Sequence, residues 1–261
     1  MAETDLLATW LANEAGLKVP ASGPLTVATA HSADGRAAAQ DVPWPHCGPV
    51  LLAEHGPDAL HVAVLDQPII TAERHNLAGE PRAVIEFDLA AIDVVSLPLT
   101  IADELTIRGA WCRCIQIIGA FDAAAELTVT HTGSRVQFGR PLSTFQAVQH
   151  ALAAMLGEIE RSRAATILAI RAADQYGFGD ARTAYAVSVA KVAVGRAVAP
   201  VTTIAHQLHG AIGTTAEHPL WRATMRARSW ADEFGSAGWH ARRLAGRATA
   251  AEPWDVIVGR I

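Results

Sequence analysis

The chain has 261 residues, 51% of them hydrophobic and only 18% charged, which is enough apolar material for one or two folded domains and excludes a disordered protein. A formal net charge of -5 and an isoelectric point near 6.1 provide no basic surface, so we expect no nucleic-acid partner. We expect no membrane partner and a cytoplasmic protein, because the start is acidic and no apolar run approaches the roughly twenty residues that cross a bilayer.

The first hundred residues are rich in proline and in short apolar runs of the kind that form strands. After a short segment from Leu6 to Leu17, the clearest runs are Pro49–Leu52 and Leu60–Leu65. Turn signals lie at His55–Asp58 and Gly79–Pro81. Residues 1–100 are therefore predicted to hold this reduced amino-terminal segment and a small β-rich domain.

From about residue 101 the prolines become rare and apolar residues recur at helical spacing. This pattern predicts four long helices, at about 103–132, 143–175, 180–210 and 217–249, divided by Gly133 and by turns at 176–180 and 210–215. Four helices joined by short turns favour a four-helix bundle over residues 101–261. The predicted fold class is α+β, mainly α.

Cysteine and histidine are not arranged as a metal site. Cys112 and Cys114 are too close in sequence for an ordinary disulfide, and Cys47 stands alone, so all three are expected to be reduced thiols. His206 and His209 share a helix, but no carboxylate or cysteine near them completes a ligand set, so no metal is expected.

Two motifs carry the most specific chemistry. The stretch from Arg135 to Gln146 reads RVQFGRPLSTFQ, and Gln207 to Gly213 reads QLHGAIG. In both order and spacing they resemble the flavin-binding half of the acyl-CoA dehydrogenases. The resemblance implies FAD as cofactor, with Arg135 at its pyrophosphate and Gln207 at its adenine end. The implied FAD-contacting residues are Arg135, Gln137, Phe138, Gln146, Gln207, Gly210, Ala211 and Gly213.

The residue types suit that ligand. A guanidinium donates several N–H bonds to an anionic pyrophosphate, and glycines allow the backbone to approach a cofactor where a Cβ would collide. Ala211 departs from the family, which usually has another glycine there. Two simpler interpretations stay open: Ser143 and Gln146 form a capping box, and Gly210 to Gly213 only end the preceding helix.

The resemblance is strong after residue 101 and looser before it. Asn76–Pro81 and Phe87–Asp88 resemble the last strands of the family's middle β-domain. A full-length member also has an amino-terminal helical domain that helps cover the acyl-CoA pocket, and only the segment from Leu6 to Leu17 stands in its place. We therefore expect a truncated paralogue.

The family's catalytic base is absent from both of its usual positions. Relatives carry this glutamate in a Glu-Gly-Thr-like turn, which corresponds here to Phe234-Gly235-Ser236, or on the first bundle helix, which corresponds to Gly109. Glu233 adjoins the vacated position and is a weak candidate, because a shift of one residue rotates a helical side chain by about 100°. A phenylalanine at this position suggests a closed pseudo-active site.

The resemblance therefore implies the smaller, non-catalytic subunit of a heteromeric, actinobacterial-type acyl-CoA dehydrogenase. Its partners would be a full-length subunit with the catalytic glutamate, an acyl-CoA substrate and an electron-transfer flavoprotein, with two copies of each subunit. FAD would be shared between the subunits. Two alternatives remain: a stand-alone enzyme that uses Glu233, and a structural or regulatory protein that binds no flavin.

Overall fold

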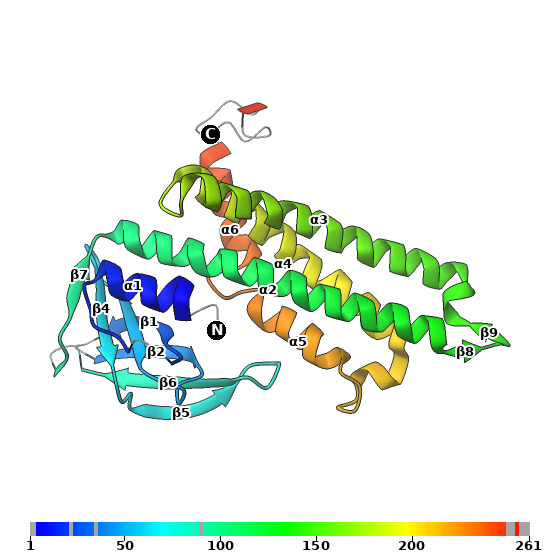
Figure 1. Cartoon of the computed structure of the whole chain (residues 1–261), viewed down its shortest axis with the longest axis horizontal. Coiled ribbons are helices and arrows are strands. Elements are labelled where there is room, and N and C mark those ends of the chain that lie inside the picture. The colour runs from blue at the N-terminus through cyan, green and yellow to red at the C-terminus, as the bar shows by residue number, and fades with distance from the viewer. Residues whose placement is uncertain (1–3, 21–22, 34–35, 89–90, 249–253, 256–261) are drawn as a thin grey trace. The chain divides into compact units, whose positions relative to one another are not determined.

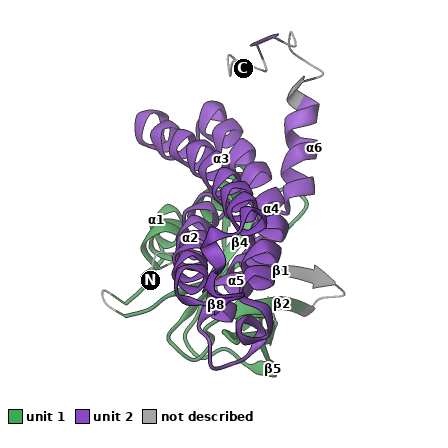
Figure 2. Cartoon of the chain, turned by 90° about the vertical axis from the view of Figure 1, so that its right-hand side faces the viewer, with its two compact units in different colours: residues 1–109 green, residues 110–261 purple. Residues whose placement is uncertain are grey.

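The computed structural model describes residues 4–20, 23–33, 36–88, 91–248 and 254–255 (Figure 1). The chain divides into two compact units, residues 1–109 and 110–261 (Figure 2). From the sequence we placed a boundary near residue 100. Helix α2 (Leu99–Ser134) begins there and continues through the division between the units.

A mixed seven-stranded sheet forms most of the first unit. Its strands are β1 (Thr26–Ala33), β2 (Arg36–Pro43), β3 (Val50–His55), β4 (Leu60–Leu65), β5 (Ile70–His75), β6 (Pro81–Phe87) and β7 (Val95–Leu97). They lie in the order β5-β6-β2-β1-β3-β4-β7, and every pair is antiparallel except β1 with β3. The predicted strands at 49–52 and 60–65 are confirmed as β3 and β4, which pair with Val50 opposite Leu65.

Side chains that alternate along these strands form the core of the sheet. One buried cluster consists of Ala28, Ala30, Ala39, Val42, Val50, Leu52 and Ile85. The segment at the amino terminus folds as a π-helical turn η1 (Thr4–Thr9) and helix α1 (Trp10–Glu14), and buries Leu7 and Leu11. The Thr4 hydroxyl ties it to the residue that precedes β1, by donating to the carbonyl oxygen of Leu25 at 3.2 Å.

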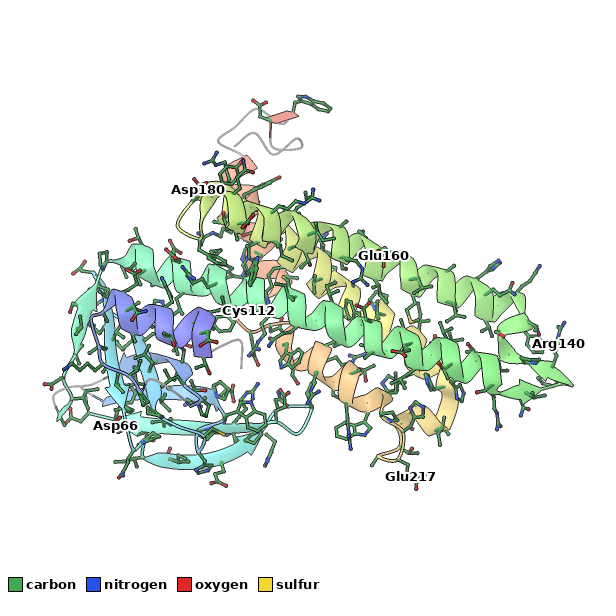
Figure 3. The ribbon with its side chains drawn as sticks, viewed as in Figure 1. Asp66, Cys112, Arg140, Glu160, Asp180 and Glu217 are labelled. Atoms are coloured by element: carbon green, nitrogen blue, oxygen red, sulfur yellow. The ribbon has the colours of Figure 1, made fainter. Side chains whose placement is uncertain are left out.

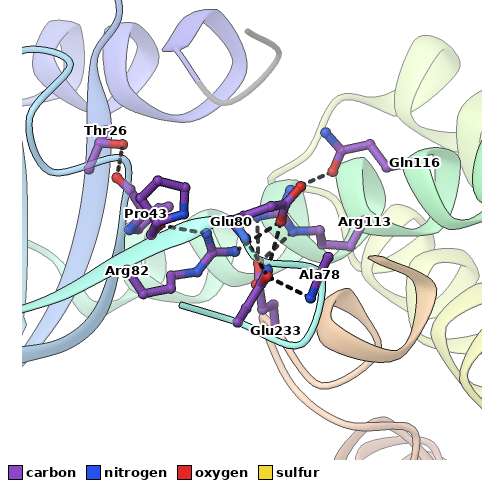
Figure 4. Close-up of polar contacts among 10 residues, drawn as sticks. Thr26, Pro43, Ala78, Glu80, Arg82, Arg113, Gln116 and Glu233 are labelled. Carbon is purple, nitrogen blue, oxygen red and sulfur yellow. Dashed lines mark hydrogen bonds and ion pairs between the residues drawn. The ribbon is translucent and has the colours of Figure 1, made fainter. Parts of the chain in front are cut away.

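Asn76 organises the turn between β5 and β6. Its Oδ1 accepts from the backbone N–H groups of Ala78 at 2.9 Å and Glu80 at 3.0 Å, and its Nδ2 donates to the Glu80 carboxylate at 2.7 Å. The same carboxylate lies 3.6 Å from Arg82, and Figure 4 shows these contacts. Gly79 has a φ of 75°, a backbone conformation that is unfavourable for residues with a side chain. The predicted turn at residues 79–81 therefore depends on this glycine.

Helices form the second unit. They are α2 from residue 110 onward, α3 (Gln146–Tyr176), α4 (Ala181–His209), α5 (Leu220–Trp230) and α6 (Ala237–Ala248). Short elements join them: a hairpin of β8 (Val136–Gln137) and β9 (Arg140–Pro141), and the 3-10 turns η3 (Leu142–Thr144) and η4 (Gly210–Thr214). The first three predicted helices match α2, α3 and α4 to within a few residues, and the α+β, mainly α fold class is confirmed.

The prediction of one continuous helix over 217–249 is wrong. The chain forms α5 and α6 there, separated by a turn over residues 231–236, and residue 249 lies outside the described residues. Phe234 and Gly235 have φ values of 55° and 95°, which no right-handed helix can include. The fourth arm of the bundle is therefore bent at the turn that the resemblance associates with catalysis.

Helix α4 has many buried residues. It begins at Asp180, whose carboxylate caps the helix by accepting the N–H of Arg182 at 2.8 Å; Figure 3 labels Asp180 at the turn from α3 into α4. By length and composition alone the segment from Ala181 to Thr214 could cross a membrane, contrary to our expectation that no such run exists. In the structure 56% of its most apolar window is buried, as in a core helix.

Candidate functional site

A short hairpin carries the first motif at one end of the bundle. Arg135 follows α2 directly, and Gln137 pairs with Arg140 across a two-residue turn. Both turn residues have positive φ, 53° at Phe138 and 78° at Gly139, as a tight hairpin requires. The Phe138 side chain is 91% exposed and Arg140 lies at the same tip (Figure 3).

The second motif forms the end of α4. Gly210, with a φ of 64°, stops the helix, and its N–H donates to the carbonyl oxygen of His206. The helix-stop interpretation is therefore correct for Gly210. A Cβ added there would meet nothing within 4 Å, whereas a Cβ at Gly213 would lie 2.7 Å from the Cβ of His209. Gly213 is thus required by the packing of its own chain, and only Gly210 leaves backbone open to a ligand.

Three histidine rings bring the two motifs to the same end of the bundle. His131 of α2 stacks on His209 of α4 with ring centroids 4.5 Å apart, and His218 contacts His209 at 4.7 Å. Burial lowers the pKa of His131, and the charges of His218 and Arg135 lower it further. Burial also lowers the pKa of His209. Arg135 and Gly210 therefore belong to one neighbourhood although 75 residues separate them in sequence.

The polar side chains that the resemblance assigns to FAD are on the surface of this neighbourhood. Arg135, Gln137, Gln146 and Gln207 are all exposed. An anionic, extended ligand could meet the guanidinium and the amides without disturbing the core, so the residues present fit the cofactor. The capping-box alternative is wrong: the N-cap of α3 is Phe145, which makes no side-chain cap.

The base position lies in the turn between α5 and α6. The Glu233 carboxylate does not point into an empty site, because Arg113 of α2 donates to it from Nε at 2.6 Å and from Nη2 at 2.5 Å. Arg113 is 3% exposed and also donates to Gln116 at 2.5 Å (Figure 4). The Phe234 ring lies beneath the same guanidinium, 5.9 Å from its carbon.

Two buried side chains fix this turn. Lys191 of α4 donates from Nζ to the carbonyl oxygens of Ala231 at 2.9 Å and Glu233 at 2.7 Å. His240 of α6 donates from Nε2 to the carbonyl oxygen of Phe234 at 3.0 Å. Burial lowers the pKa of Lys191 to about 8 and that of His240 to about 4. Both side chains therefore stabilise the backbone of the turn from inside the bundle.

Sequence reasoning did not identify Arg113, Lys191 or His240. Arg113 is 120 residues from Glu233, and Lys191 is 42 residues from the same residue, so no local spacing reveals either contact. Gly109, the alternative base position, is a buried residue within α2 and has no side chain that could remove a proton.

The cysteines of the described residues belong neither to a disulfide nor to a metal site. No disulfide joins Cys47, Cys112 and Cys114, and burial raises the pKa of Cys114 to about 12, which keeps it protonated. Within the described residues, no group of three or more histidine, cysteine, aspartate or glutamate side chains could hold a metal ion.

A pocket of about 370 Å³ lies between α2 and α5. It is lined by Gln116, Gly119, Ala120, Ala123, Leu127, Pro219, Arg222, Ala223, Arg226 and Trp230. Neither Phe234 nor Glu233 is part of this lining. This pocket is therefore not the closed pseudo-active site that we expected at Phe234.

Comparison with known proteins identifies relatives of this chain. Residues 100–249 match the family model described as acyl-CoA dehydrogenase, C-terminal domain. Probable acyl-CoA dehydrogenase FadE2 of Mycobacterium tuberculosis is 34% identical over 126 residues, which are 46% of this chain and 30% of the relative. Acyl-CoA dehydrogenase IpdE2 of Mycolicibacterium smegmatis is 32% identical over 127 residues, which are 49% and 38%. The chain thus matches about a third of the length of these relatives.

Solved structures resemble the fold over most of the chain. The Tcur3481-Tcur3483 steroid ACAD G363A variant superposes with a TM-score of 0.73 at 24% identity, covering 87% of this chain and 68% of its own. The ChsE4-ChsE5 complex from Mycobacterium tuberculosis superposes with a TM-score of 0.72 at 20% identity, covering 88% and 67%. At these identities the likeness shows the fold alone.

Proposed function

Because the chain belongs to the acyl-CoA dehydrogenase family, we propose that it is the smaller, non-catalytic subunit of a heteromeric FAD-dependent acyl-CoA dehydrogenase. Family membership implies an oxidoreductase that acts on a CH–CH bond. The observation that carries the proposal is a contrast within one chain. The polar side chains suited to FAD are exposed together at one end of the bundle, whereas the base position holds Phe234 and its neighbouring carboxylate is already paired.

The cofactor-binding half of the proposal rests on the hairpin and the end of α4. Arg135 would hold the pyrophosphate, and Gln207 with the open backbone at Gly210 would meet the adenine end. Gln137, Phe138 and the other residues assigned from sequence would complete the contact. When bound, FAD would accept a hydride from the acyl β-carbon.

The non-catalytic half rests on the turn between α5 and α6. A general base must reach the substrate's α-proton with a carboxylate that is available to accept it. Arg113 already donates twice to Glu233, and Lys191 and His240 fix the backbone around it. These contacts argue against the stand-alone enzyme that would use Glu233.

Apolar side chains that are exposed to solvent support the need for a partner. Helix α3 exposes Leu156, Ile167, Leu168 and Ile170, the most exposed being Leu168 at 59%. Exposed apolar side chains can mark a protein interface. One similar structure is itself a complex, ChsE4-ChsE5. The partner we propose is a full-length acyl-CoA dehydrogenase subunit with its catalytic glutamate. Two copies of each subunit would form the heteromer, which would pass electrons to an electron-transfer flavoprotein in the cytoplasm.

Co-expression tests the proposal. The chain would carry the only affinity tag and would be produced alone or with the full-length acyl-CoA dehydrogenase encoded nearest to it. Absorbance near 450 nm relative to protein would then be measured after purification. We expect the isolated chain to be colourless or weakly yellow, and the co-purified pair to be yellow and active with an acyl-CoA.

Other results would contradict the proposal in distinct ways. An isolated chain that is fully flavinylated and reduces a dye with acyl-CoA would indicate a stand-alone enzyme. A complex that stays colourless would indicate a structural or regulatory protein that binds no flavin.

A further inference from the structure

Three histidine rings, those of His131, His209 and His218, pack against one another at the end of the bundle that carries Arg135. We propose that His131 takes up a proton when an anion binds at Arg135, so that this end of the bundle binds its anion more tightly as the pH falls. The inference rests on the proposed function in one respect, that Arg135 holds a pyrophosphate. It adds to that function a residue, His131, that lies outside both motifs.

His131 and Arg135 lie one turn apart at the end of α2. The backbone N–H of Arg135 donates to the carbonyl oxygen of His131 at 2.9 Å, so the two side chains leave the same side of the helix. Arg135 is exposed, whereas His131 is half-buried. The charge of Arg135 acts on the imidazole and is one of the causes that lower the pKa of His131. An anion that neutralises Arg135 therefore removes one of the causes that keep His131 neutral.

The groups around the His131 ring are themselves bases. From α4, His209 stacks on it with ring centroids 4.5 Å apart, and from the segment before α5, His218 meets it edge-on at 6.3 Å. His206 of α4 acts on His209 through its charge. Glu217 precedes His218, but it is exposed and is not among the charges that shift the pKa of His131 or His209. Within the described residues, the charges that act on His131 are thus positive, and a bound anion would offset them.

The hydrogen bonds of the cluster leave His131 as the ring that can accept a proton. His209 donates from Nδ1 to the carbonyl oxygen of Ala205 at 2.8 Å, and its Nε2 is buried. Nδ1 of His218 already accepts the backbone N–H of Leu220 at 3.2 Å. No hydrogen bond among the described residues occupies either ring nitrogen of His131, and this side chain is partly open to water. Solvent can therefore protonate it without breaking another contact.

A metal ion does not explain the cluster. The rings of His131 and His209 lie face to face with an interplanar angle of 19°, whereas histidines that bind one ion direct their nitrogens to a common point. In the part of the chain that the structure describes, no group of three or more metal-ligating side chains could hold an ion. A stack that stays neutral until an anion arrives is the alternative that this geometry supports.

Linkage gives the direction and the size of the effect. Burial and the charges of His218 and Arg135 hold the pKa of His131 below the ordinary histidine value of 6.5. A bound pyrophosphate adds negative charge and raises this pKa. The affinity is therefore constant above the raised pKa and increases as the pH falls towards the pKa of the free chain. Since one pKa unit corresponds to about a tenfold change, we expect binding at pH 6 to be tighter than at pH 8 by about three- to tenfold.

Calorimetry of ADP-ribose binding to the intact chain tests the inference. This probe carries adenosine and a pyrophosphate diester but no flavin, and its pyrophosphate keeps both charges from pH 6 to pH 8. Heats measured in two buffers of different ionisation enthalpy give the number of protons taken up. We expect roughly half a proton or more per ADP-ribose at pH 6, together with the three- to tenfold change in affinity. Adenosine lacks the pyrophosphate and is expected to cause no proton uptake.

Variants assign the proton. His131→Gln cannot titrate, so it should bind ADP-ribose at both pH values as the wild type does at pH 8. His131→Arg is permanently charged and should bind at both pH values at least as tightly as the wild type does at pH 6. The matched control is His75→Gln, an exposed histidine of the first unit, which should keep the wild-type proton uptake.

A measurement on the wild type does not depend on how the variants fold. In an NMR titration of the imidazole groups, saturation with ADP-ribose should raise the pKa of His131 and leave that of His75 unchanged.

The inference is overturned if ADP-ribose does not bind, if it binds without proton uptake, or if the uptake persists in His131→Gln. The proposed function fails separately. A chain that binds ADP-ribose equally at both pH values but acquires flavin with a partner keeps the proposed function and loses this inference. Proton-linked binding of ADP-ribose by a chain whose complexes never contain flavin has the reverse meaning.

Discussion

Arg113 of α2 donates to a single carboxylate oxygen of Glu233 from both Nε and Nη2, at 2.6 and 2.5 Å. The guanidinium is almost fully buried, whereas the Glu233 side chain is 27% exposed. A carboxylate held in this way neutralises a buried cation, which would otherwise be costly to keep out of water. Glu233 therefore has a structural task that competes with any catalytic one.

The isolated chain is expected to show no acyl-CoA dehydrogenase activity, because neither Phe234 nor Gly109 carries a base and Glu233 is paired. Dye reduction over a panel of acyl-CoA thioesters, with added FAD, measures this. Glu233→Gln is expected to leave that baseline unchanged. Robust turnover that disappears in Glu233→Gln would instead assign catalysis to Glu233.

Lys191 is expected to contribute to stability through the turn between α5 and α6. Lys191→Met keeps the length of the side chain but leaves the carbonyl oxygens of Ala231 and Glu233 without their donor, so the free energy of unfolding should fall by about 2–4 kcal/mol. Urea unfolding measures the change. Arg196→Met, at an exposed position of the same helix, is the control and should change it by less than about 0.5 kcal/mol. Equal losses in both variants would contradict this role.

Stability should decrease in mild acid because of His240. Burial lowers its pKa in the folded protein to about 4, below the ordinary histidine value of 6.5. Between these values the unfolded chain binds a proton that the folded chain does not, so the free energy of unfolding falls as the pH falls. For this residue alone we expect a loss of about 2 kcal/mol between pH 7 and pH 5. The lowered pKa values of His131 and His209 act in the same direction.

Denaturant unfolding at the two pH values tests this. His240→Gln retains a donor for the carbonyl oxygen of Phe234 but cannot titrate, so its loss of stability between pH 7 and pH 5 should be smaller than that of the wild type by about 2 kcal/mol. His150→Gln, at an exposed position of α3, should keep the wild-type dependence. A pH dependence that is the same in all three proteins would contradict the assignment.

Local signals in the sequence were sufficient for most helices and strands. Helical periodicity and the glycine turns located α2, α3 and α4, because each signal acts within a few residues. The same periodicity runs through Phe234 and Gly235, and it therefore predicted one helix where the structure has two. What bends the chain there includes hydrogen bonds from Lys191 and His240, and Lys191 lies on another helix.

For the candidate site, the sequence predicted which residues belong to it but not how they are arranged. The two motifs named Arg135 and Gly210, but only the packing of His131 on His209 places them at one end of the bundle. The sequence could not distinguish a glycine needed for a ligand from one needed for packing. In the structure Gly210 has open space, whereas Gly213 faces His209 and Leu220.

The isolated chain is expected to self-associate through the exposed apolar side chains of α3. Replacing Ile167 and Leu168 by glutamate should weaken this association by about tenfold or more, because each apolar side chain contributes roughly 1.5–3 kcal/mol when buried. Light scattering at several protein concentrations measures it. Leu77→Glu changes another leucine, 65% exposed in the first unit, and should have no effect. A wild-type chain that is monomeric at all concentrations would count against an α3 interface.

Arg135 and Arg140 provide the most direct test of the flavin assignment, because both are exposed arginines at the same hairpin. They differ in their surroundings. The Arg140 guanidinium lies 4.1 Å from the ring of Phe145, whereas no carboxylate among the described residues pairs with Arg135. The resemblance assigns the pyrophosphate to Arg135 and assigns no phosphate to Arg140.

Arg135→Ala in the assembled complex should therefore lower the affinity for FAD by about ten- to a hundredfold, since a charge-assisted hydrogen bond contributes roughly 1.5–3 kcal/mol. Arg140→Ala should leave the affinity nearly unchanged, because it removes only the contact with Phe145. The ratio of flavin to protein absorbance, measured at limiting FAD for both variants and the wild type, reports the difference. Equal ratios in the two variants would mean that this chain keeps the sequence of the motif without using it to bind flavin.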